Sequence, residues 1–133
     1  MSSNWTAEKN SHGIAGATTD GGVAGHGSSS PYDIHNTLIA AGPDFREHAS
    51  SDVPTGNVDV APTLLHLLGL KPPPSMAGRV IEEALREGPA PSSVRVEHVK
   101  DTVRTADLTY ELTAHISIVA GRRYLDFTEV TRR

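Results

Sequence analysis

Cysteine is absent from this chain of 133 residues, which excludes both a disulfide scaffold and a thiolate zinc site. Long apolar runs are also absent, because no stretch approaches the ~20 residues that a membrane-spanning helix needs. The start of the chain lacks the basic and then apolar pattern of a signal peptide. We therefore expect a soluble chain without a membrane span. Its compartment stays unknown, and any targeting signal of a longer protein would lie in the missing part.

Positive charge is in short supply. The chain carries 12 Lys and Arg against 16 Asp and Glu, a net charge of −4. Binding to a nucleic-acid backbone needs clustered basic side chains, so we expect no such partner. The length suits one domain with a modest core, and 9 prolines with 37% hydrophobic residues indicate a loop-rich globular chain.

The most informative stretch is a histidine between two glycines, His26, followed by Ser28. The glycines allow backbone angles that are closed to other residues, so the loop can present the imidazole to a nearby ligand. Neutral imidazole suits zinc, but the spacing alone leaves a structural or surface histidine open. A nucleophilic Ser28 beside His26 is rejected, because no third orienting group is identifiable. His12 is interpreted as a loop histidine, and His35 as a strand-entry residue or a group that orients a metal ligand.

Secondary structure follows from short patterns. Residues 38–41 are apolar and end at Gly-Pro, which predicts a buried strand. Asp59 as a cap, Pro62 in the first turn and Gly69 at the end predict a helix, whose apolar stripe is Val60, Leu64, Leu67 and Leu68. A second short helix is expected after Gly78, with Arg79 and Glu83 as an outward-facing charged pair. Residues 88–93 have linker composition.

Beyond residue 94 the hydrophobic period changes to two. Residues 108–118 alternate apolar and polar side chains, which predicts a half-buried strand with His115 on its polar face. A turn at residues 120–121 and a returning strand at 122–131 indicate a small antiparallel sheet or hairpin.

Several of these stretches form an ordered series of blocks. The series resembles the C-terminal end of the alkaline phosphatase superfamily, nearest to the type I phosphodiesterase / nucleotide pyrophosphatase branch and its sulfatase-like relatives. The blocks in chain order are residues 26–28, 36–45, 54–63, 67–70 and 78–80, with a weaker resumption at 124–126.

The resemblance implies a fold and a chemistry. The fold would be α/β: residues 1–91 would be the C-terminal part of a three-layer sandwich, an inner strand with covering helices, and residues 92–133 antiparallel strands of the same domain. The activity would be metal-dependent hydrolysis of phosphate mono- or diesters at a two-zinc site. His26 would be the last zinc ligand in sequence. The nucleophile and the other ligands come from upstream segments in that family and have no counterpart here, so no catalytic residue is assigned.

Three further readings stay open. The chain could hydrolyse sulfate esters, or it could be a catalytically incomplete fragment that serves as a structural or partner-binding piece. A third reading makes residues 94–131 a small β-rich interaction module. The expected partners are a phosphate- or sulfate-ester small molecule in the complete protein, and the missing N-terminal part or a second copy of the chain. An isolated chain should be marginally stable, because a truncated sheet leaves an open edge.

Overall fold

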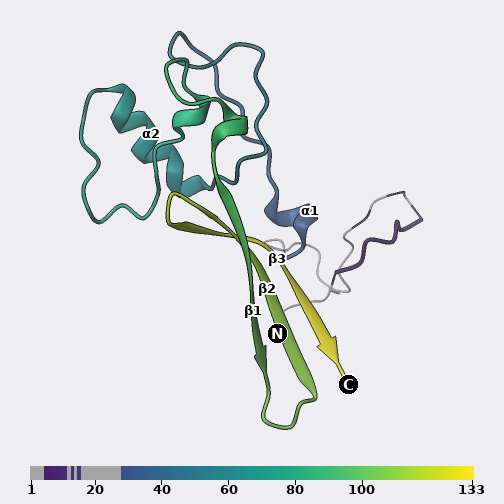
Figure 1. The fold of residues 1–133 in the computed structure, drawn as a ribbon. Coiled ribbons are helices and arrows are strands. Elements are labelled where there is room, and N and C mark those ends of the chain that lie inside the picture. The colour runs from purple at the N-terminus through teal and green to yellow at the C-terminus, as the bar shows by residue number, and fades with distance from the viewer. Residues whose placement is uncertain (1–4, 12, 14, 16–27) are drawn as a thin grey trace. The chain divides into compact units, whose positions relative to one another are not determined.

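A computed structural model describes residues 5–11, 13, 15 and 28–133 of the chain (Figure 1). Its helices are α1 (Pro31–Ile34) and α2 (Val60–Leu67), with 3-10 turns η1 (Asn57–Asp59), η2 (Glu82–Ala84) and η3 (Pro91–Ser93). Its strands are β1 (Val96–Arg104), β2 (Tyr110–Val119) and β3 (Arg122–Arg132). None of the described helices is both long and apolar enough to cross a membrane.

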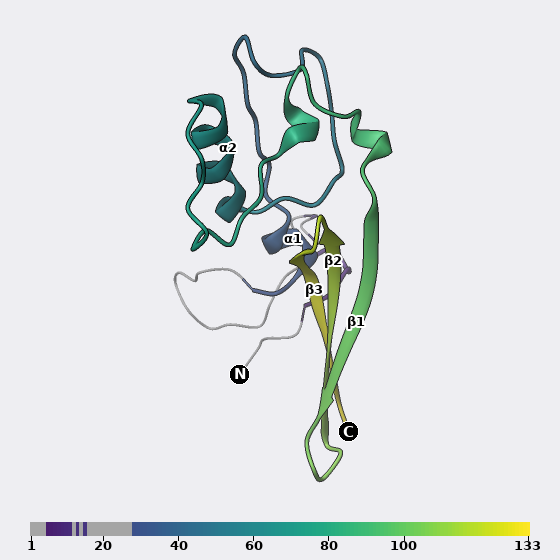
Figure 2. The same cartoon turned by 60° about the vertical axis from the view of Figure 1, so that its left-hand side comes forward.

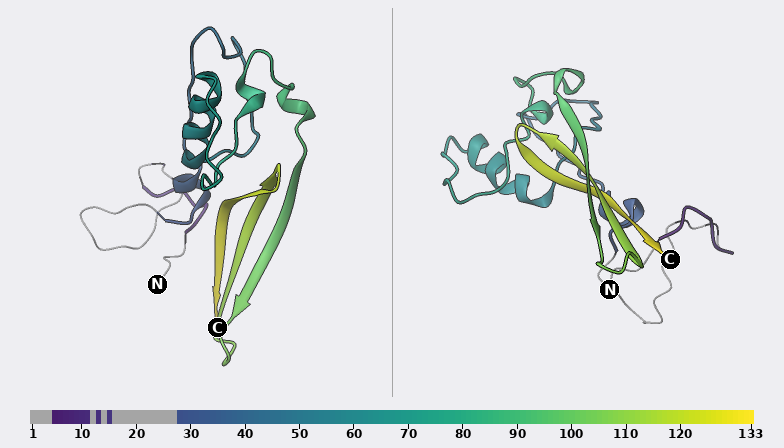
Figure 3. Two further views of the ribbon diagram at one scale, coloured as in Figure 1. Left: turned by 90° about the vertical axis from the view of Figure 1, so that its left-hand side faces the viewer. Right: turned by 60° about the horizontal axis from the view of Figure 1, so that its bottom comes forward.

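The strands form one sheet in the order β1-β2-β3, with antiparallel neighbours. Figures 2 and 3 show the strands side by side and twisting about one another. The predicted turn joins β2 to β3 at Ala120 and Gly121, where both residues have positive φ, 49° and 75°. Two consecutive positive φ angles are what a tight two-residue hairpin turn requires. The predicted strand and its return are therefore present.

Cross-strand pairs hold the register of the sheet. Thr102 and Thr113 share a hydrogen bond of 3.0 Å between their hydroxyls. Two residues farther along β1, Arg104 forms an ion pair with Glu111 on β2. His115 stacks on Phe127 of β3, with ring centroids 4.0 Å apart. His115 was expected to be exposed on a polar face, but this stacking leaves its side chain only 16% accessible.

The chain divides into two compact units that are interleaved in sequence. The first unit combines Met1–Thr37, His98–Ile116 and Leu125–Arg133, and the second combines Leu38–Glu97 and Ser117–Tyr124. Among the described residues, the large apolar side chains that are buried are Ile81, Leu85 and Val119, all in the second unit. This is a small apolar core, so polar contacts carry much of the packing.

Helix α2 confirms the prediction of a helix, but its expected stripe is not covered. Gly69, with φ 69°, ends the helix, and its N–H donates to the His66 carbonyl at 2.9 Å. Val60, Leu64 and Leu68 on the stripe are 37%, 51% and 71% exposed. The buried residues of α2 are instead Pro62 and Thr63. The helix therefore packs inward through residues outside the expected stripe.

The predicted fold class is wrong for the described residues. They form a small antiparallel sheet with short helical turns, and not a three-layer α/β sandwich with covering helices. Residues 38–41 form no strand, and Leu38 and Ile39 are 54% and 84% exposed. A strand needs a neighbouring strand to complete its backbone hydrogen bonds, and no described segment provides one for this stretch.

In place of the second predicted helix, the structure has only the single 3-10 turn η2. Side chains from the region of α2 occupy the backbone donors at its expected start. The Arg79 N–H donates to Asp59 Oδ1 at 2.7 Å, and the Ile81 N–H donates to the Thr63 hydroxyl at 3.0 Å. Side-chain acceptors of this kind compete with helical hydrogen bonds. Both residues were expected to face outward, but Glu83 is buried and the Arg79 side chain is only 9% exposed.

Candidate functional site

The proposed zinc ligand His26, like His12, lies outside the described residues. The chain that follows it is held by named contacts. The backbone N–H and the hydroxyl of Ser28 both donate to Asp33 Oδ2, at 2.9 and 2.5 Å. Ser30 caps α1 by accepting from the Tyr32 N–H at 3.1 Å. Ser28 is thus bound to the carboxylate of Asp33, five residues farther along the chain.

Thr128 on β3 is an anchor for both the first described residue and the segment after His26. The Trp5 indole N–H donates to the Thr128 carbonyl at 2.7 Å. The Thr128 N–H donates to the Ser29 carbonyl at 2.9 Å, and the two hydroxyls are hydrogen-bonded. Trp5 also meets Phe127 edge-on, with ring centroids 5.9 Å apart. Two segments distant in sequence are therefore fixed at one residue of the sheet.

The histidines that the structure describes do not gather with acidic residues into a metal centre. Among the described residues, no group of three or more His, Asp or Glu side chains could hold a metal ion. His35 follows α1, and its N–H donates to the Pro31 carbonyl at 3.1 Å. The expected backbone bond of His35 is therefore present, but the strand that it was expected to enter is not. His115 bonds Glu129 at 2.8 Å. The described side chains therefore do not by themselves fit a zinc pair.

The second unit is organised around a polar cluster that we call the Asp59 clasp, made of Asp59, Arg79, Glu83 and Tyr124. Asp59 has no accessible surface. Its Oδ2 accepts the Gly56 N–H at 2.8 Å, and its Oδ1 accepts the Arg79 N–H at 2.7 Å. Its carboxylate is therefore satisfied by two backbone donors, one in its own turn and one 20 residues farther along the chain.

Arg79 connects the rest of the clasp. Its guanidinium binds both carboxylate oxygens of Glu83, at 2.6 and 2.8 Å, in the bidentate geometry that strengthens such pairs. It also donates to the Pro54 carbonyl and to the Tyr124 hydroxyl, each at 3.1 Å. The Arg79 and Glu83 side chains are 9% and 2% exposed. Fixed partners on every side make this a rigid buried ion pair.

The clasp shifts two pKa values. Burial, followed by the hydrogen bond and charge of Asp59, raises the pKa of Tyr124 above its ordinary value, and Arg79 opposes part of that rise. Burial acts to lower the pKa of Arg79, but the bond and charge of Glu83 outweigh it and the pKa is raised. Arg79 therefore stays charged, and Tyr124 stays protonated at neutral pH.

Gly78 shows how closely the clasp is packed. A Cβ on Gly78 would lie 2.0 Å from the Val58 carbonyl oxygen, well inside van der Waals contact. The backbone before Asp59 thus touches the backbone before Arg79, and only glycine permits the approach. Sequence reasoning missed this site because it interpreted Asp59 as a helix cap and the Arg79–Glu83 pair as solvated. The signal was a charged pair directly after glycine and beside the apolar residues 80–81.

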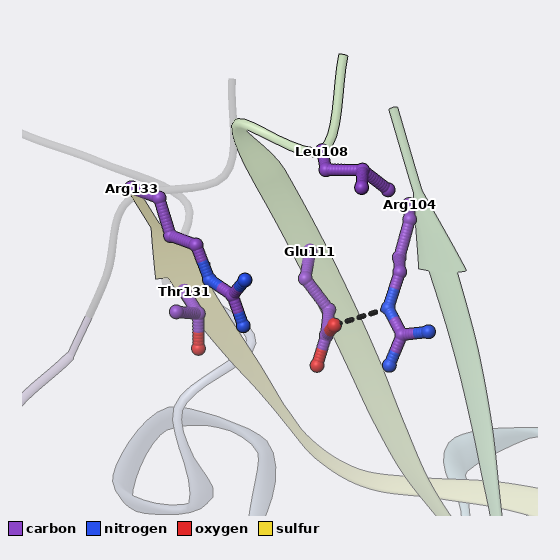
Figure 4. A pocket seen from close by; sticks show the side chains of 5 residues that line it. All are labelled: Arg104, Leu108, Glu111, Thr131 and Arg133. Carbon is purple, nitrogen blue, oxygen red and sulfur yellow. Dashed lines mark hydrogen bonds and ion pairs between the residues drawn. The ribbon is translucent and has the colours of Figure 1, made fainter. Parts of the chain in front are cut away.

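A shallow pocket of about 250 Å³ lies in the first unit, where β1 ends and β3 ends (Figure 4). The side chains of Arg104, Glu111 and Thr131 come from three neighbouring strands, and Leu108 and Arg133 complete the lining. Sequence analysis assigned no role to these residues. Their chemistry is that of two guanidinium groups around one carboxylate, with a hydroxyl and an apolar wall.

Comparison with protein-family models, with curated proteins and with solved structures gives no match to this chain.

Proposed function

We propose that this chain is the C-terminal segment of a metal-dependent hydrolase of phosphate mono- or diesters. His26 is its contribution to a two-zinc site, and the nucleophile and remaining ligands belong to a complementary part. The observation that carries the proposal is the Asp59 clasp. It joins two of the blocks on which the resemblance rests, residues 54–63 and 78–80, through the Asp59–Arg79 backbone contact of 2.7 Å.

Exposed apolar side chains support the need for a complementary part. Leu38, Ile39, Leu64 and Leu68 are each more than half exposed. Soluble monomers seldom gather large exposed apolar patches, and such patches usually mark interaction surfaces. The predicted association with a missing N-terminal part would cover these side chains. Self-association remains the competing way to cover them.

We propose zinc as the metal because of the chemistry of the proposed ligand, His26. A neutral imidazole favours zinc over magnesium or calcium, which prefer oxygen ligands. His26 would hold the ion through one ring nitrogen, and zinc would supply Lewis-acid polarisation of the ester and a more acidic bound water. Sulfate-ester hydrolysis uses similar oxyanion chemistry and remains a second possibility by resemblance.

The alternative from another class is a structural or partner-binding piece without catalysis. The same four exposed apolar side chains favour it, because a partner that covers them need not take part in any reaction. The two proposals differ in whether the native assembly contains zinc. A hydrolase segment carries zinc and phosphatase activity into its native assembly through His26, whereas a structural piece assembles equally well without that histidine.

The experiment is purification of the native protein through an affinity tag after Arg133, followed by metal analysis. The same preparation is assayed with nitrophenyl phosphate, bis-nitrophenyl phosphate and nitrophenyl sulfate. We expect zinc and hydrolysis of at least one phosphate ester. Faster sulfate turnover selects the sulfatase reading, and an assembly with neither zinc nor turnover selects the structural piece.

A further inference from the structure

The pocket in Figure 4 has a charge arrangement that the hydrolase proposal does not use. Arg104 reaches it from β1, Glu111 from β2 and Arg133 from the residue after β3, so adjacent strands bring the three side chains to one end of the sheet. The lining side chains carry two positive charges and one negative charge. This local excess of positive charge contrasts with a chain whose net charge is −4.

Glu111 balances the charge of one guanidinium but pairs with only one of its nitrogens. Its Oε2 pairs with the Nε of Arg104, which leaves the two terminal nitrogens of that side chain outside the pair. The guanidinium of Arg133 points into the same pocket, beside the Thr131 hydroxyl (Figure 4). Guanidinium nitrogens and a hydroxyl are the donors that bind phosphate oxygens.

An apolar wall comes from a strained residue. Leu108 has φ 57°, a left-handed conformation that glycine and asparagine adopt more readily than leucine. The turn is fixed by Asp107, whose Oδ1 accepts the Thr105 hydroxyl at 2.6 Å and the Thr109 N–H at 3.1 Å. The chain therefore keeps a leucine where the backbone favours another residue, and that leucine lines the pocket while 60% exposed.

We infer that this end of the sheet binds an organic phosphate monoester, with the phosphate on Arg104 and Arg133 and the carbon part against Leu108. The site is independent of His26, because none of its residues belongs to the blocks that resemble the hydrolase family. Its volume of about 250 Å³ suits a small ligand and not a polymer. No bond is made or broken there, so it is a binding site and not a second catalytic centre.

Two probes separate the phosphate from its carbon part. Inorganic phosphate and phenyl phosphate are titrated into the ¹⁵N-labelled chain at constant ionic strength, and amide chemical shifts are followed. Both should give saturating shifts at Glu111, Thr131 and Arg133, with phenyl phosphate the tighter ligand. Free phosphate as the natural ligand is indicated if the two probes bind equally, which overturns the role of Leu108.

Matched variants test each group. Because one hydrogen bond to a charged group typically changes affinity by about tenfold or more, Arg133→Gln and Arg104→Gln should each weaken phenyl phosphate binding by about that factor. Arg122→Gln, an exposed arginine at the opposite end of β3, should change it less than about twofold. Leu108→Asn relieves the backbone strain, so it should stabilise the turn and remove the preference for phenyl over inorganic phosphate.

Three results overturn the site. Shifts that grow linearly without saturation mean non-specific attraction to arginine. A loss of affinity in Arg122→Gln as large as that in Arg104→Gln or Arg133→Gln also means non-specific attraction. The proposed site is also refuted if Arg104→Gln and Arg133→Gln bind phenyl phosphate as tightly as the wild-type chain and unfold at the same midpoint. Because His26→Ala should leave the titration unchanged, the result stands or fails separately from the proposed hydrolase function.

Discussion

Asp59 and Arg79 meet through the backbone and not through their opposite charges. The Asp59 carboxylate accepts the Arg79 N–H at 2.7 Å, while the Arg79 guanidinium turns to Glu83 at 2.6 Å. Each acid therefore has its own donors. The clasp ties the chain before α2 to the turn before η2 and, through the Tyr124 hydroxyl, to β3. Three segments of the second unit are therefore joined by one set of hydrogen bonds.

Breaking the buried ion pair should be costly. Arg79→Met leaves the Glu83 carboxylate, 2% exposed, without its partner, and stranding a buried charge of this kind typically costs about 3–5 kcal/mol. Arg86→Met removes an exposed pair with Glu47, 51% and 74% accessible, and should cost less than about 1 kcal/mol. Urea unfolding of both variants measures the difference. Equal losses would mean that the Arg79 pair is solvated in solution.

Alkaline pH should weaken the fold through Tyr124. Its pKa is raised in the folded state by burial and by Asp59, so the folded chain holds the hydroxyl proton more tightly than the unfolded chain. The resulting stability is complete below the unfolded pKa of about 10 and is lost as pH rises through the folded pKa. Ultraviolet titration of tyrosinate should show one late-titrating group that Tyr124→Phe removes. The wild-type chain has three tyrosines and the variant has two. If their titration curves superimpose when each is expressed per tyrosine, this prediction is contradicted.

Gly78 should not tolerate a side chain. Ala at this position would place its Cβ 2.0 Å from the Val58 carbonyl oxygen, so the two backbone segments of the clasp would have to separate. We expect Gly78→Ala to destabilise the chain by about 2–4 kcal/mol or to prevent folding. Gly56→Ala is the matched control, because its nearest contact would be an ordinary 3.6 Å. Circular dichroism and thermal unfolding compare the two, and a Gly78→Ala chain as stable as Gly56→Ala would refute the close approach.

The exposed stripe of α2 should matter for association more than for folding. Leu64 is 51% exposed, so Leu64→Glu removes little buried apolar area and should change unfolding by less than about 1 kcal/mol. The same change should weaken association with the complementary part or with a second copy. Thr63→Val gives the opposite pattern, because it removes a buried hydroxyl that bonds Asp59 and Ile81. Analytical ultracentrifugation and urea unfolding separate the effects; a Leu64→Glu chain that assembles normally would exclude the stripe.

Local signals in the sequence were read correctly where one segment determines its own structure. The helix at residues 60–67 follows from its period and from Gly69, and the hairpin of β2 and β3 follows from alternation around Ala120 and Gly121. The prediction of a strand at residues 38–41 was wrong because a strand depends on a neighbouring strand, which the described part of the chain does not provide. The Asp59 clasp was missed because its hydrogen bonds join residues that are distant in sequence. The zinc ligand His26 stays a prediction, since it lies outside the described residues.

The proposed function depends on His26, and metal analysis of the native assembly tests it most directly. Assemblies purified through a tag after Arg133 are compared for wild type, His26→Ala and His66→Ala, the last being an exposed histidine on α2. Loss of a catalytic ligand should cut zinc content and phosphate-ester hydrolysis by at least about 10–100-fold in His26→Ala, whereas His66→Ala should match wild type. Equal zinc and equal rates in all three proteins would contradict the proposed function.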